Sequence, residues 1–273
     1  MNMADKYDVL IIGGGIAGIS AALTCRNRGK TVAVVANSTE SQSLYKAEKI
    51  TNYPGTPEMT GKELAESLKR QLDSCGADII HGRALSVMNL GDSFGVAVGN
   101  DFYQATAVIL ALGITREKLY PGEAEYVGRG VSYCATCDGM LYKGKKVALI
   151  GSSEEAYEDV KFLQEICSEV EHFPKPAACE IRGGMKADTL VVNGEEHKVD
   201  AVFIIKDSIA VSQLAAGLEK DKTGIVVDRS MATSVPGIFA AGDCTGKPYQ
   251  LAKSAGEGNI AALSACEYIQ KRR

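Results

Sequence analysis

The chain has 273 residues, of which 45% are hydrophobic and 23% charged, a composition typical of a globular protein with one large domain or two smaller ones. A net charge of −4 leaves no basic excess for nucleic acid, so we expect no nucleic-acid partner. No apolar run is long enough to span a bilayer, and eight cysteines without a signal-peptide pattern indicate a reducing, cytoplasmic location and no membrane partner.

The first predicted element is a buried strand over residues 7–12. It leads into Gly13-Gly-Gly15-Ile-Ala-Gly18, which is followed by a predicted helix and by a second strand over 31–35. Strand, G-x-G-x-x-G, helix and strand in this order are typical of a dinucleotide-binding unit. Gly13 makes the tight turn, Gly15 lets the backbone approach a pyrophosphate, and Gly18 lets helix and strand pack closely. The alternative is a glycine turn that binds no ligand.

The second strand ends without the acidic residue that usually binds the ribose in such units. Asn37 stands there instead, and its amide could still hydrogen-bond a ribose hydroxyl, less strongly than a carboxylate would. Residues 38–60 are polar and contain Pro and Gly, a pattern that indicates a loop covering a bound cofactor and not a linker. Thr60 and Glu63 have the spacing of a capping box, so a helix is expected over 63–75.

Two short strand-like pieces follow this helix, and then an apolar strand over 107–113. The sequence Cys134-Ala-Thr-Cys137-Asp138 comes next. A C-x-x-C pair is either a redox dithiol or half of a zinc site, and zinc needs about two further Cys or His ligands at defined spacing. The other cysteines and the histidines are scattered. The spacing therefore favours a redox dithiol, and we expect no metal site.

An internal repeat indicates two domains. Residues 145–156 repeat the strand, turn and helix of the first glycine motif. We therefore predict an α/β protein with two Rossmann-like, three-layer nucleotide-binding domains, the second shortened and inserted into the first. The first domain is expected over 1–113 and 211–273, where an Ala/Gly-rich helix from about Ser254 completes it. The second is expected over 114–210.

Three motifs together resemble those of the low-molecular-weight thioredoxin reductases. They are G-G-G-I-A-G at residues 13–18, C-A-T-C-D-G at 134–139 and G-I-F-A-A-G-D at 237–243. The resemblance covers nearly the whole chain. It implies a homodimeric flavoprotein disulfide reductase that has FAD in the first domain, NADPH in the second and thioredoxin as its substrate.

The resemblance also implies a role for each residue of the dithiol motif. Cys137 would exchange electrons with the flavin, Cys134 would attack the substrate disulfide, and Asp138 would act as acid or base. A thiolate is the attacking species, and a helix start lowers a thiol pKa. The alternative for Asp138 is a helix N-cap. The residues expected at FAD are Gly13, Gly15, Ile16, Ala17, Gly18, Asn37, Asn52, Gly113, Gly242, Asp243, Gln250, Leu251 and Ala252.

The second glycine turn departs from the family pattern. It reads Gly151-Ser-Ser-Glu-Glu-Ala, with Ser153 where bare backbone should meet a pyrophosphate. Residues 152–171 hold seven Asp and Glu against one Lys, which disfavours a bound phosphate. In place of a basic cluster for the 2′-phosphate, the next strand leads to Lys175 between two prolines. Residues 114–210 carry 12 Lys and Arg against 17 Asp and Glu. We therefore expect no competent NADPH site in this domain.

Electrons must then reach FAD from another donor. Among relatives with a shrunken second domain, the chain most resembles the ferredoxin-dependent flavin thioredoxin reductases, which implies ferredoxin as donor. Basic residues that flank the dithiol could receive an acidic ferredoxin, or could be ordinary solvated side chains: Arg129, Lys143, Lys145 and Lys146. Three alternatives stay open. They are a reductase that uses NADPH or NADH, a flavin-dependent dithiol oxidase that uses oxygen, and a flavin-bound redox sensor that is no enzyme.

Overall fold

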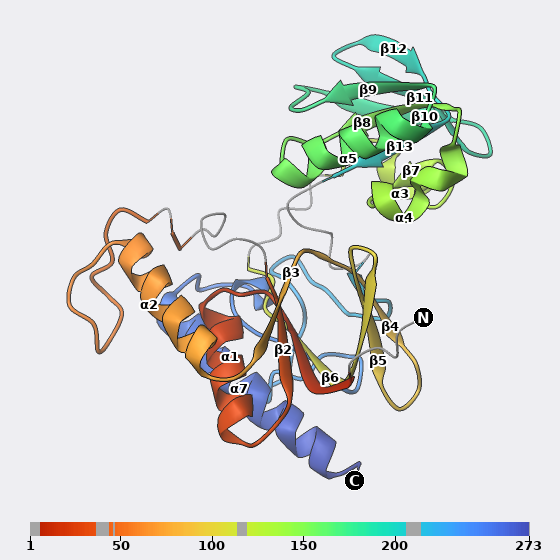
Figure 1. Cartoon of the computed structure of the whole chain (residues 1–273). Helices are drawn as coiled ribbons and strands as arrows, with labels where there is room; N and C mark the ends of the chain where they lie inside the picture. The colour runs from red at the N-terminus through yellow and green to blue at the C-terminus, as the bar shows by residue number, and fades with distance from the viewer. Residues whose placement is uncertain (1–5, 37–43, 46, 114–118, 206–213, 273) are drawn as a thin grey trace. The chain divides into compact units, whose positions relative to one another are not determined.

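The computed structural model describes residues 6–36, 44–45, 47–113, 119–205 and 214–272. The chain forms two compact units, and the second is inserted into the first (Figure 1). Unit 1 comprises residues 1–115 and 210–273, and unit 2 comprises residues 116–209. Both units combine parallel strands with helices, and the expected α/β class is confirmed.

Unit 1 is built on a seven-stranded sheet with the order β3-β2-β1-β6-β5-β4 and with β14 paired to β6. The strands are β1 (Lys6–Ile12), β2 (Val32–Ala36), β3 (Asp78–His81), β4 (Ala84–Asn89), β5 (Phe94–Val98), β6 (Asp101–Leu110) and β14 (Ile238–Ala240). The pairs from β3 to β6 and the β14 pair are parallel, whereas β4 and β5 add an antiparallel extension. Because parallel strands end together, the turn after β1 and the loop after β14 lie at the same edge of the sheet.

Three helices share the main core of unit 1 with β1 and β2: α1 (Ile16–Asn27), α2 (Gly61–Ser74) and α7 (Leu251–Gln270). Helices α1 and α7 lie side by side (Figure 1). Their contact is close because small residues line it, and a Cβ added to Gly258 would lie 2.1 Å from the carbonyl oxygen of Ala17. Helix α7 begins three residues earlier than the sequence pattern indicated.

Helix α2 begins with the predicted capping box. The backbone N–H of Glu63 donates to Thr60 Oγ1 at 3.2 Å, and the backbone N–H of Thr60 donates to Glu63 Oε2 at 2.7 Å. These bonds satisfy backbone donors that a helix start leaves without an intrahelical partner. The helix spans Gly61–Ser74, so the expected start was two residues late.

Unit 2 contains a parallel four-stranded sheet with the order β7-β13-β8-β9 and an antiparallel three-stranded sheet with the order β10-β11-β12. Its strands are β7 (Val131–Ser132), β8 (Lys146–Ile150), β9 (Glu169–Phe173), β10 (Cys179–Gly183), β11 (Ala187–Val192), β12 (Glu195–Lys198) and β13 (Ala201–Ile204). Its helices are α3 (Glu123–Tyr126), α4 (Ala135–Asp138), a 3₁₀ turn (Gly139–Tyr142) and α5 (Glu154–Ile166).

Alternate residues of β8 divide the core of unit 2 into two layers. Val147 and Leu149 pack in one cluster with α5, whereas Ala148 and Ile150 pack in another with β10 and β11. This is the two-residue period of a strand that is buried on both faces. The antiparallel sheet was not anticipated from the sequence, because the strand β12 is short and reads Glu-Glu-His-Lys, without an apolar pattern.

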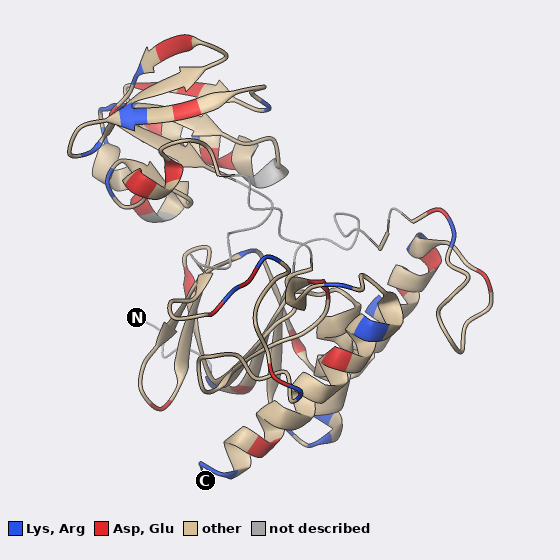
Figure 2. Cartoon of the chain, turned by 180° about the vertical axis from the view of Figure 1, so that it is seen from behind, with Lys and Arg blue, Asp and Glu red and all other residues tan. Residues whose placement is uncertain are grey.

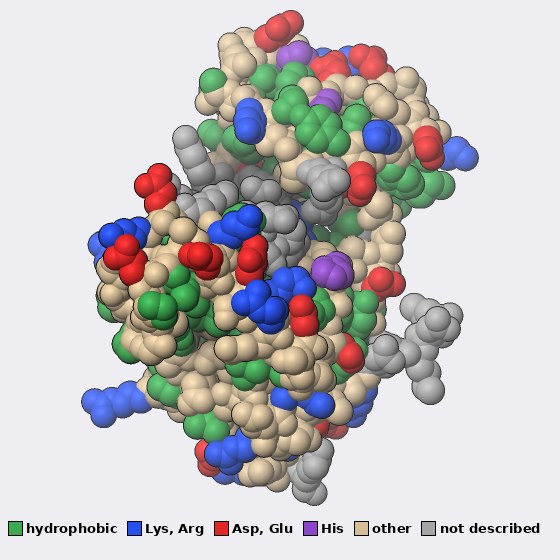
Figure 3. Space-filling view, turned by 60° about the vertical axis from the view of Figure 1, so that its left-hand side comes forward, with side chains coloured by type: hydrophobic (Ala, Val, Ile, Leu, Met, Phe, Trp, Pro, Cys, Tyr) green, Lys and Arg blue, Asp and Glu red, His purple; other side chains and the backbone are tan. Residues whose placement is uncertain are grey.

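Charged residues are distributed differently over the two units. Asp and Glu recur along unit 2, where the ribbon is red at these residues in Figure 2. Over unit 1, the face in Figure 3 shows Lys and Arg among Asp and Glu, without a continuous patch of one sign. Among the described residues, no helix is both long and apolar enough to cross a membrane.

Candidate functional site

The dithiol motif connects β7 to a short helix. Strand β7 pairs with β13, so Ser132 is fixed opposite Phe203 in the sheet. Cys134 then precedes α4, which contains Cys137. Cys134 is partly buried and disulfide-bonded, and the hydroxyl oxygen of Thr136 lies 3.4 Å from its sulfur. The side chain of Cys137 lies outside the described part of the structure.

A serine that the sequence analysis did not single out holds Asp138. Ser132 Oγ lies 2.6 Å from Asp138 Oδ2, so the hydroxyl donates a hydrogen bond to the carboxylate. The same oxygen accepts the backbone N–H of Cys134 at 3.2 Å. Asp138 stands at the N-cap of the 3₁₀ turn that follows it, but its side chain makes no capping hydrogen bond there. Only 7% of Ser132 is exposed, which shields the pair from water.

A second carboxylate anchors the residue before Cys134. The Tyr133 hydroxyl donates to Glu123 Oε1 at 3.0 Å, and the backbone N–H of Tyr120 donates to Glu123 Oε2 at 2.8 Å. Glu123 is fully buried. Burial, with smaller contributions from Cys179 and Glu123, raises the pKa of the Tyr120 phenol. The connection from β7 to α4 is therefore fixed by side-chain hydrogen bonds on both sides of Cys134.

In unit 1, the first glycine turn has the geometry that a pyrophosphate requires. A Cβ added to Gly18 would lie 1.8 Å from the Gly13 carbonyl oxygen. Only a glycine at position 18 therefore lets α1 pack this closely against the turn. A Cβ added to Gly15 would meet no atom within 4 Å. Gly15 is also the N-cap of α1, so the N-cap has no side chain to accept from the first N–H groups, and no acidic residue stands in the first turn. Ile16 and Ala17 follow in that turn, and both are buried. This helix start fits an anionic phosphate.

Gly242 and Asp243 precede α7 in the sequence, and both are hydrogen-bonded to side chains in the first two turns of that helix. Ser254 donates to Asp243 Oδ1 at 3.1 Å, and the backbone N–H of Gly242 donates to Glu257 Oε2 at 2.9 Å. Lys253 Nζ donates to the carbonyl oxygens of Gly242 at 2.8 Å and Gly246 at 2.7 Å, and to Thr245 Oγ1 at 2.9 Å. It also pairs with Glu257 at 3.2 Å. Lys253 and Glu257 thus fix this loop to α7.

The remaining expected FAD residues are placed as follows. Asn52 Nδ2 donates to Gln250 Oε1 at 2.9 Å, which joins two expected positions that are far apart in sequence. Gln250 is the N-cap of α7, and Leu251 and Ala252 form its first turn. Gly113 has a φ of +69° in the segment after β6. Asn37 lies outside the described residues.

The second glycine turn differs from the first at the helix start. Ser153 is the N-cap of α5, and its hydroxyl accepts the backbone N–H of Ala156 at 3.2 Å. Gly151 is a packing position, because an added Cβ would lie 2.5 Å from the carbonyl oxygen of Ile205 and 2.9 Å from the Ala156 side chain. At the start of α5, a side chain therefore already satisfies a backbone N–H group of the kind that a phosphate could use at the start of α1.

Two aromatic side chains also cover the second turn. His172 Nε2 lies 2.8 Å from the carbonyl oxygen of Gly151, so the ring donates to the first residue of the turn. The Tyr157 ring packs edge-on against His172 with a centroid distance of 5.1 Å. His172 stands in β9, the strand whose end would carry the basic residues of an NADPH site.

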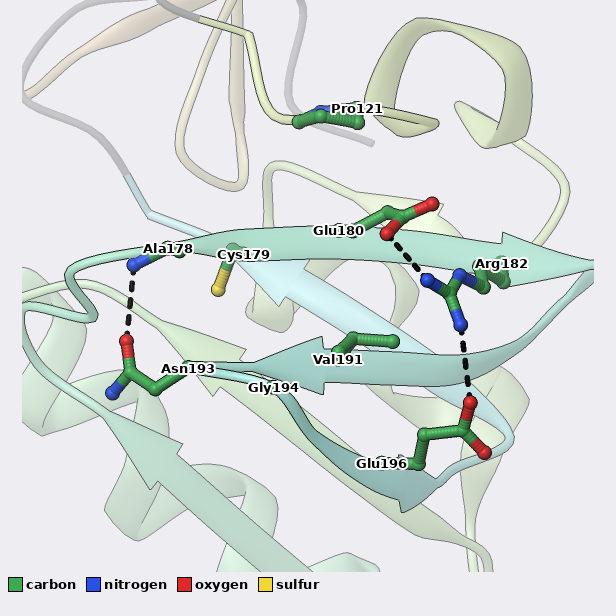
Figure 4. Close-up of a pocket in the computed structure, with 9 residues that line it drawn as sticks. All are labelled: Pro121, Ala178, Cys179, Glu180, Arg182, Val191, Asn193, Gly194 and Glu196. Carbon is green, nitrogen blue, oxygen red and sulfur yellow. Dashed lines mark hydrogen bonds and ion pairs between the residues drawn. The ribbon is translucent and has the colours of Figure 1, made fainter.

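A pocket of about 420 Å³ opens on β10 and β11 of unit 2 (Figure 4). Its guanidinium, from Arg182, is paired with Glu180 at 2.7 Å and with Glu196 at 3.1 Å. The side-chain oxygen of Asn193 accepts the backbone N–H of Ala178 at 3.0 Å. These polar groups are already satisfied within the protein. The pocket is lined by Pro121, Ala178, Cys179, Glu180, Arg182, Val191, Asn193, Gly194 and Glu196.

Of the residues that sequence reasoning missed, three bind expected site residues directly, and Glu123 binds Tyr133, the residue before Cys134. Ser132, Glu123, Lys253 and Glu257 belong to no motif, and no spacing in the sequence marks them. Within the described ranges, no group of three or more His, Cys, Asp and Glu residues could hold a metal ion.

Comparison with known proteins gives three kinds of similarity. The family model described as pyridine nucleotide-disulphide oxidoreductase matches residues 7–172 and 169–258. A thioredoxin reductase from Treponema pallidum is 34% identical over 98% of this chain and 98% of its own. A crystal structure of a ferredoxin-flavin thioredoxin reductase from Clostridium acetobutylicum is 41% identical, with a TM-score of 0.89 and coverage of 98% and 99%. A thioredoxin reductase structure from Gloeobacter violaceus is 29% identical, with a TM-score of 0.82 and coverage of 98% and 96%.

Proposed function

We propose that this chain, which belongs to the pyridine nucleotide-disulphide oxidoreductase family, passes electrons from ferredoxin through FAD and the Cys134/Cys137 dithiol to thioredoxin. It is a flavin disulfide reductase of the thioredoxin reductase type. The finer proposal names the donor and the residues. When bound, FAD accepts single electrons from an iron-sulfur protein and delivers a pair to a disulfide.

The observation that carries the choice of donor is the contrast between two helix starts. At α1, the N-cap is Gly15, which has no side chain to accept from the first N–H groups. At α5, the Ser153 hydroxyl accepts the Ala156 N–H, and His172 is bonded to the Gly151 carbonyl. The α1 turn can therefore receive a pyrophosphate, whereas the α5 turn offers fewer free donors in an acidic surrounding. This supports a reductase that does not draw electrons from NADPH.

In the proposed reaction, the reduced dithiol attacks the disulfide of thioredoxin. Cys134 would be the attacking thiolate at the start of α4, and Cys137 would close the protein disulfide again. Asp138 would exchange the proton with the thiols, and Ser132 would hold its carboxylate in place at 2.6 Å. The disulfide at Cys134 corresponds to the oxidised form of this cycle.

The surface beside the motif suits a protein substrate. Met140 and Leu141, which follow Asp138 and Gly139, are 56% and 77% exposed. Exposed large apolar side chains next to a reactive group favour a macromolecular contact. Replacing both with Ser should raise the KM for thioredoxin and leave the rate with a small synthetic disulfide unchanged. An equal loss with both substrates would contradict a docking role.

The basic residues expected to receive ferredoxin differ in availability. Lys146 is paired with Glu169 at 2.9 Å and with Glu171 at 2.5 Å. Lys143 and Lys145 are exposed, and they are the better candidates for an acidic partner. The double replacement Lys143→Glu and Lys145→Glu should slow flavin reduction by ferredoxin, most strongly at low salt. Lys186→Glu, a charge reversal on the same unit, is the control and should change this rate little.

A single anaerobic experiment separates the proposal from its alternatives. The purified flavoprotein is mixed in turn with NADPH, NADH and photoreduced ferredoxin, and bleaching of the flavin and reduction of thioredoxin are followed. Rapid bleaching by ferredoxin alone is expected. Fast bleaching by NADPH would overturn the choice of donor. Rapid oxygen uptake with a dithiol donor would favour an oxidase, and no turnover with any donor would favour a sensor. Cys134→Ser should retain FAD and lose thioredoxin reduction.

A further inference from the structure

Two cysteines of unit 1 meet where α1 packs against α7. Cys25 lies in the last turn of α1, and Cys266 lies near the end of α7. Both are free thiols, and they are 0% and 3% exposed. Their side chains are hydrogen-bonded to each other, and Cys25 Sγ also lies 3.9 Å from the carbonyl oxygen of Ala262, one turn before Cys266. The two sulfur atoms are therefore neighbours in the fold, although they stand near opposite ends of the chain.

Small residues let α1 and α7 approach each other closely along their contact. A disulfide requires Cα atoms about 4.4–6.8 Å apart, which is closer than most helix pairs allow. Here the interface is lined by small residues, and a Cβ on Gly258 would meet the Ala17 carbonyl oxygen at 2.1 Å. Ala262 and Ala265 are fully buried beside Cys266. The two helices therefore touch at the level of their backbones.

The hydrogen bond between the two thiols, with a smaller effect of nearby charges, makes their pKa values unequal. The hydrogen bond from Cys25, followed by the charges of Lys30 and Arg28, lowers the pKa of Cys266 to about 7 against burial and Asp8. The same hydrogen bond and burial raise the pKa of Cys25 far above its ordinary value. Lys30 is itself only 5% exposed, so its charge is little screened by solvent. We therefore expect Cys266 to ionise more readily than Cys25.

We propose that Cys25 and Cys266 form a second redox site, which a small peroxide oxidises to a disulfide that joins α1 to α7. The Cys266 thiolate attacks one peroxide oxygen, and the O–O bond breaks. The leaving hydroxide takes up from solvent the proton that Cys266 released on ionising and becomes water. The resulting sulfenic acid is attacked by the Cys25 sulfur. The S–S bond forms, the S–O bond breaks, and a second water leaves with the Cys25 proton. Two electrons pass from the thiols to the peroxide.

Burial decides which oxidant can reach the site. A bulky disulfide cannot approach either sulfur, whereas hydrogen peroxide is little larger than water. Cys266 lies four residues before Gln270, where α7 ends. Helix ends open locally at low free-energy cost, which gives a small oxidant its route.

The test uses the full-length holoenzyme with Cys134→Ser and Cys137→Ser, so that the proposed catalytic dithiol is absent. The reduced protein is treated with hydrogen peroxide, alkylated and digested without reductant. Mass spectrometry should find a peptide pair linked through Cys25 and Cys266. Cys244 is an internal control, because it is also free and 5% exposed and burial raises its pKa to about 11. Cys266 should lose its thiol more than about ten-fold faster than Cys244.

Single variants identify the order of events. With Cys25→Ser, a sulfenic acid should accumulate at Cys266 and be trapped by dimedone. With Cys266→Ser, Cys25 should remain a thiol. Absence of the linked peptide, or loss of Cys266 no faster than loss of Cys244, would overturn the proposal. That measurement needs neither single variant, so a folding defect in one of them leaves it decisive. It is also independent of the electron donor, because thioredoxin reduction is not a readout.

Discussion

The hydroxyl of Ser132 donates a 2.6 Å hydrogen bond to the Asp138 carboxylate, from one side of Cys134 to the other. The same oxygen receives the Cys134 backbone N–H. A carboxylate that transfers protons to thiols must keep its position through the cycle, and this bond fixes it. Ser132 is therefore a positioning residue for the proposed reaction.

Ser132→Ala should lower kcat for thioredoxin reduction about ten-fold, since the loss of one oriented hydrogen bond costs about 1.4 kcal/mol. FAD content and the absorption spectrum should stay unchanged. Ser132→Thr keeps the hydroxyl and should retain most of the activity. Steady-state kinetics with thioredoxin measures both variants. Equal losses in Ser132→Ala and Ser132→Thr would show that packing of the side chain, and not its hydrogen bond, matters.

Two glycines of the first turn should respond differently to alanine. Gly15 has a φ of −77° and an open space at its Cβ, so the fold tolerates Gly15→Ala. The added methyl group would meet the pyrophosphate, and FAD affinity should fall by about ten-fold or more. Gly18→Ala should lose both FAD and stability, because its Cβ would collide with the Gly13 carbonyl oxygen. Thermal unfolding of the apoprotein and FAD titration separate the two effects. Unchanged FAD affinity in Gly15→Ala would argue against a phosphate at this turn.

Lys253 and Lys271 offer a matched pair on α7, since each pairs with a glutamate four residues away along the helix. Lys253 also donates to three oxygens of the loop at Gly242, and its side chain is 16% exposed against 73% for Lys271. Lys253→Met should lower the free energy of unfolding by about 2 kcal/mol and weaken FAD binding. Lys271→Met should change stability by less than about 0.5 kcal/mol. Denaturant unfolding is the measurement, and similar losses in both variants would contradict the assigned role of Lys253.

The capping box of α2 should make part of the stability pH-dependent. Hydrogen bonds from the Thr60 backbone and hydroxyl lower the pKa of Glu63 below its ordinary 4.5. The stabilisation is therefore fully present above pH 4.5 and is lost as the pH falls through the lowered folded-state value. The stability difference between the parent chain and Glu63→Ala should be constant near neutral pH and shrink in acid. Thr60→Ala should cost about 1 kcal/mol at neutral pH. A difference that grows in acid would contradict this sign.

Elements whose signal is local were predictable. The first glycine turn, the α2 capping box and the apolar strand that became β8 each depend on residues within a few positions of one another. In the antiparallel sheet of unit 2, by contrast, stability comes from pairing and from burial against β8, and neither leaves a period in a short polar strand such as β12. The antiparallel sheet could therefore not be predicted from the sequence.

The sequence by itself predicted the chemistry: a C-x-x-C pair followed by Asp138 as the dithiol site, a glycine turn expected to bind FAD, and an acidic second turn expected not to bind NADPH. Only the tertiary structure decided which side chains support that chemistry. Ser132 reaches Asp138 because β7 and α4 fold back on each other, and Lys253 reaches the Gly242 loop because α7 starts beside β14. Cys25 meets Cys266 because small residues let two helices touch. A sequence motif consists of residues that are close together in the chain, so it can be recognised before the fold is known. These contacts form only when the chain has folded and packed.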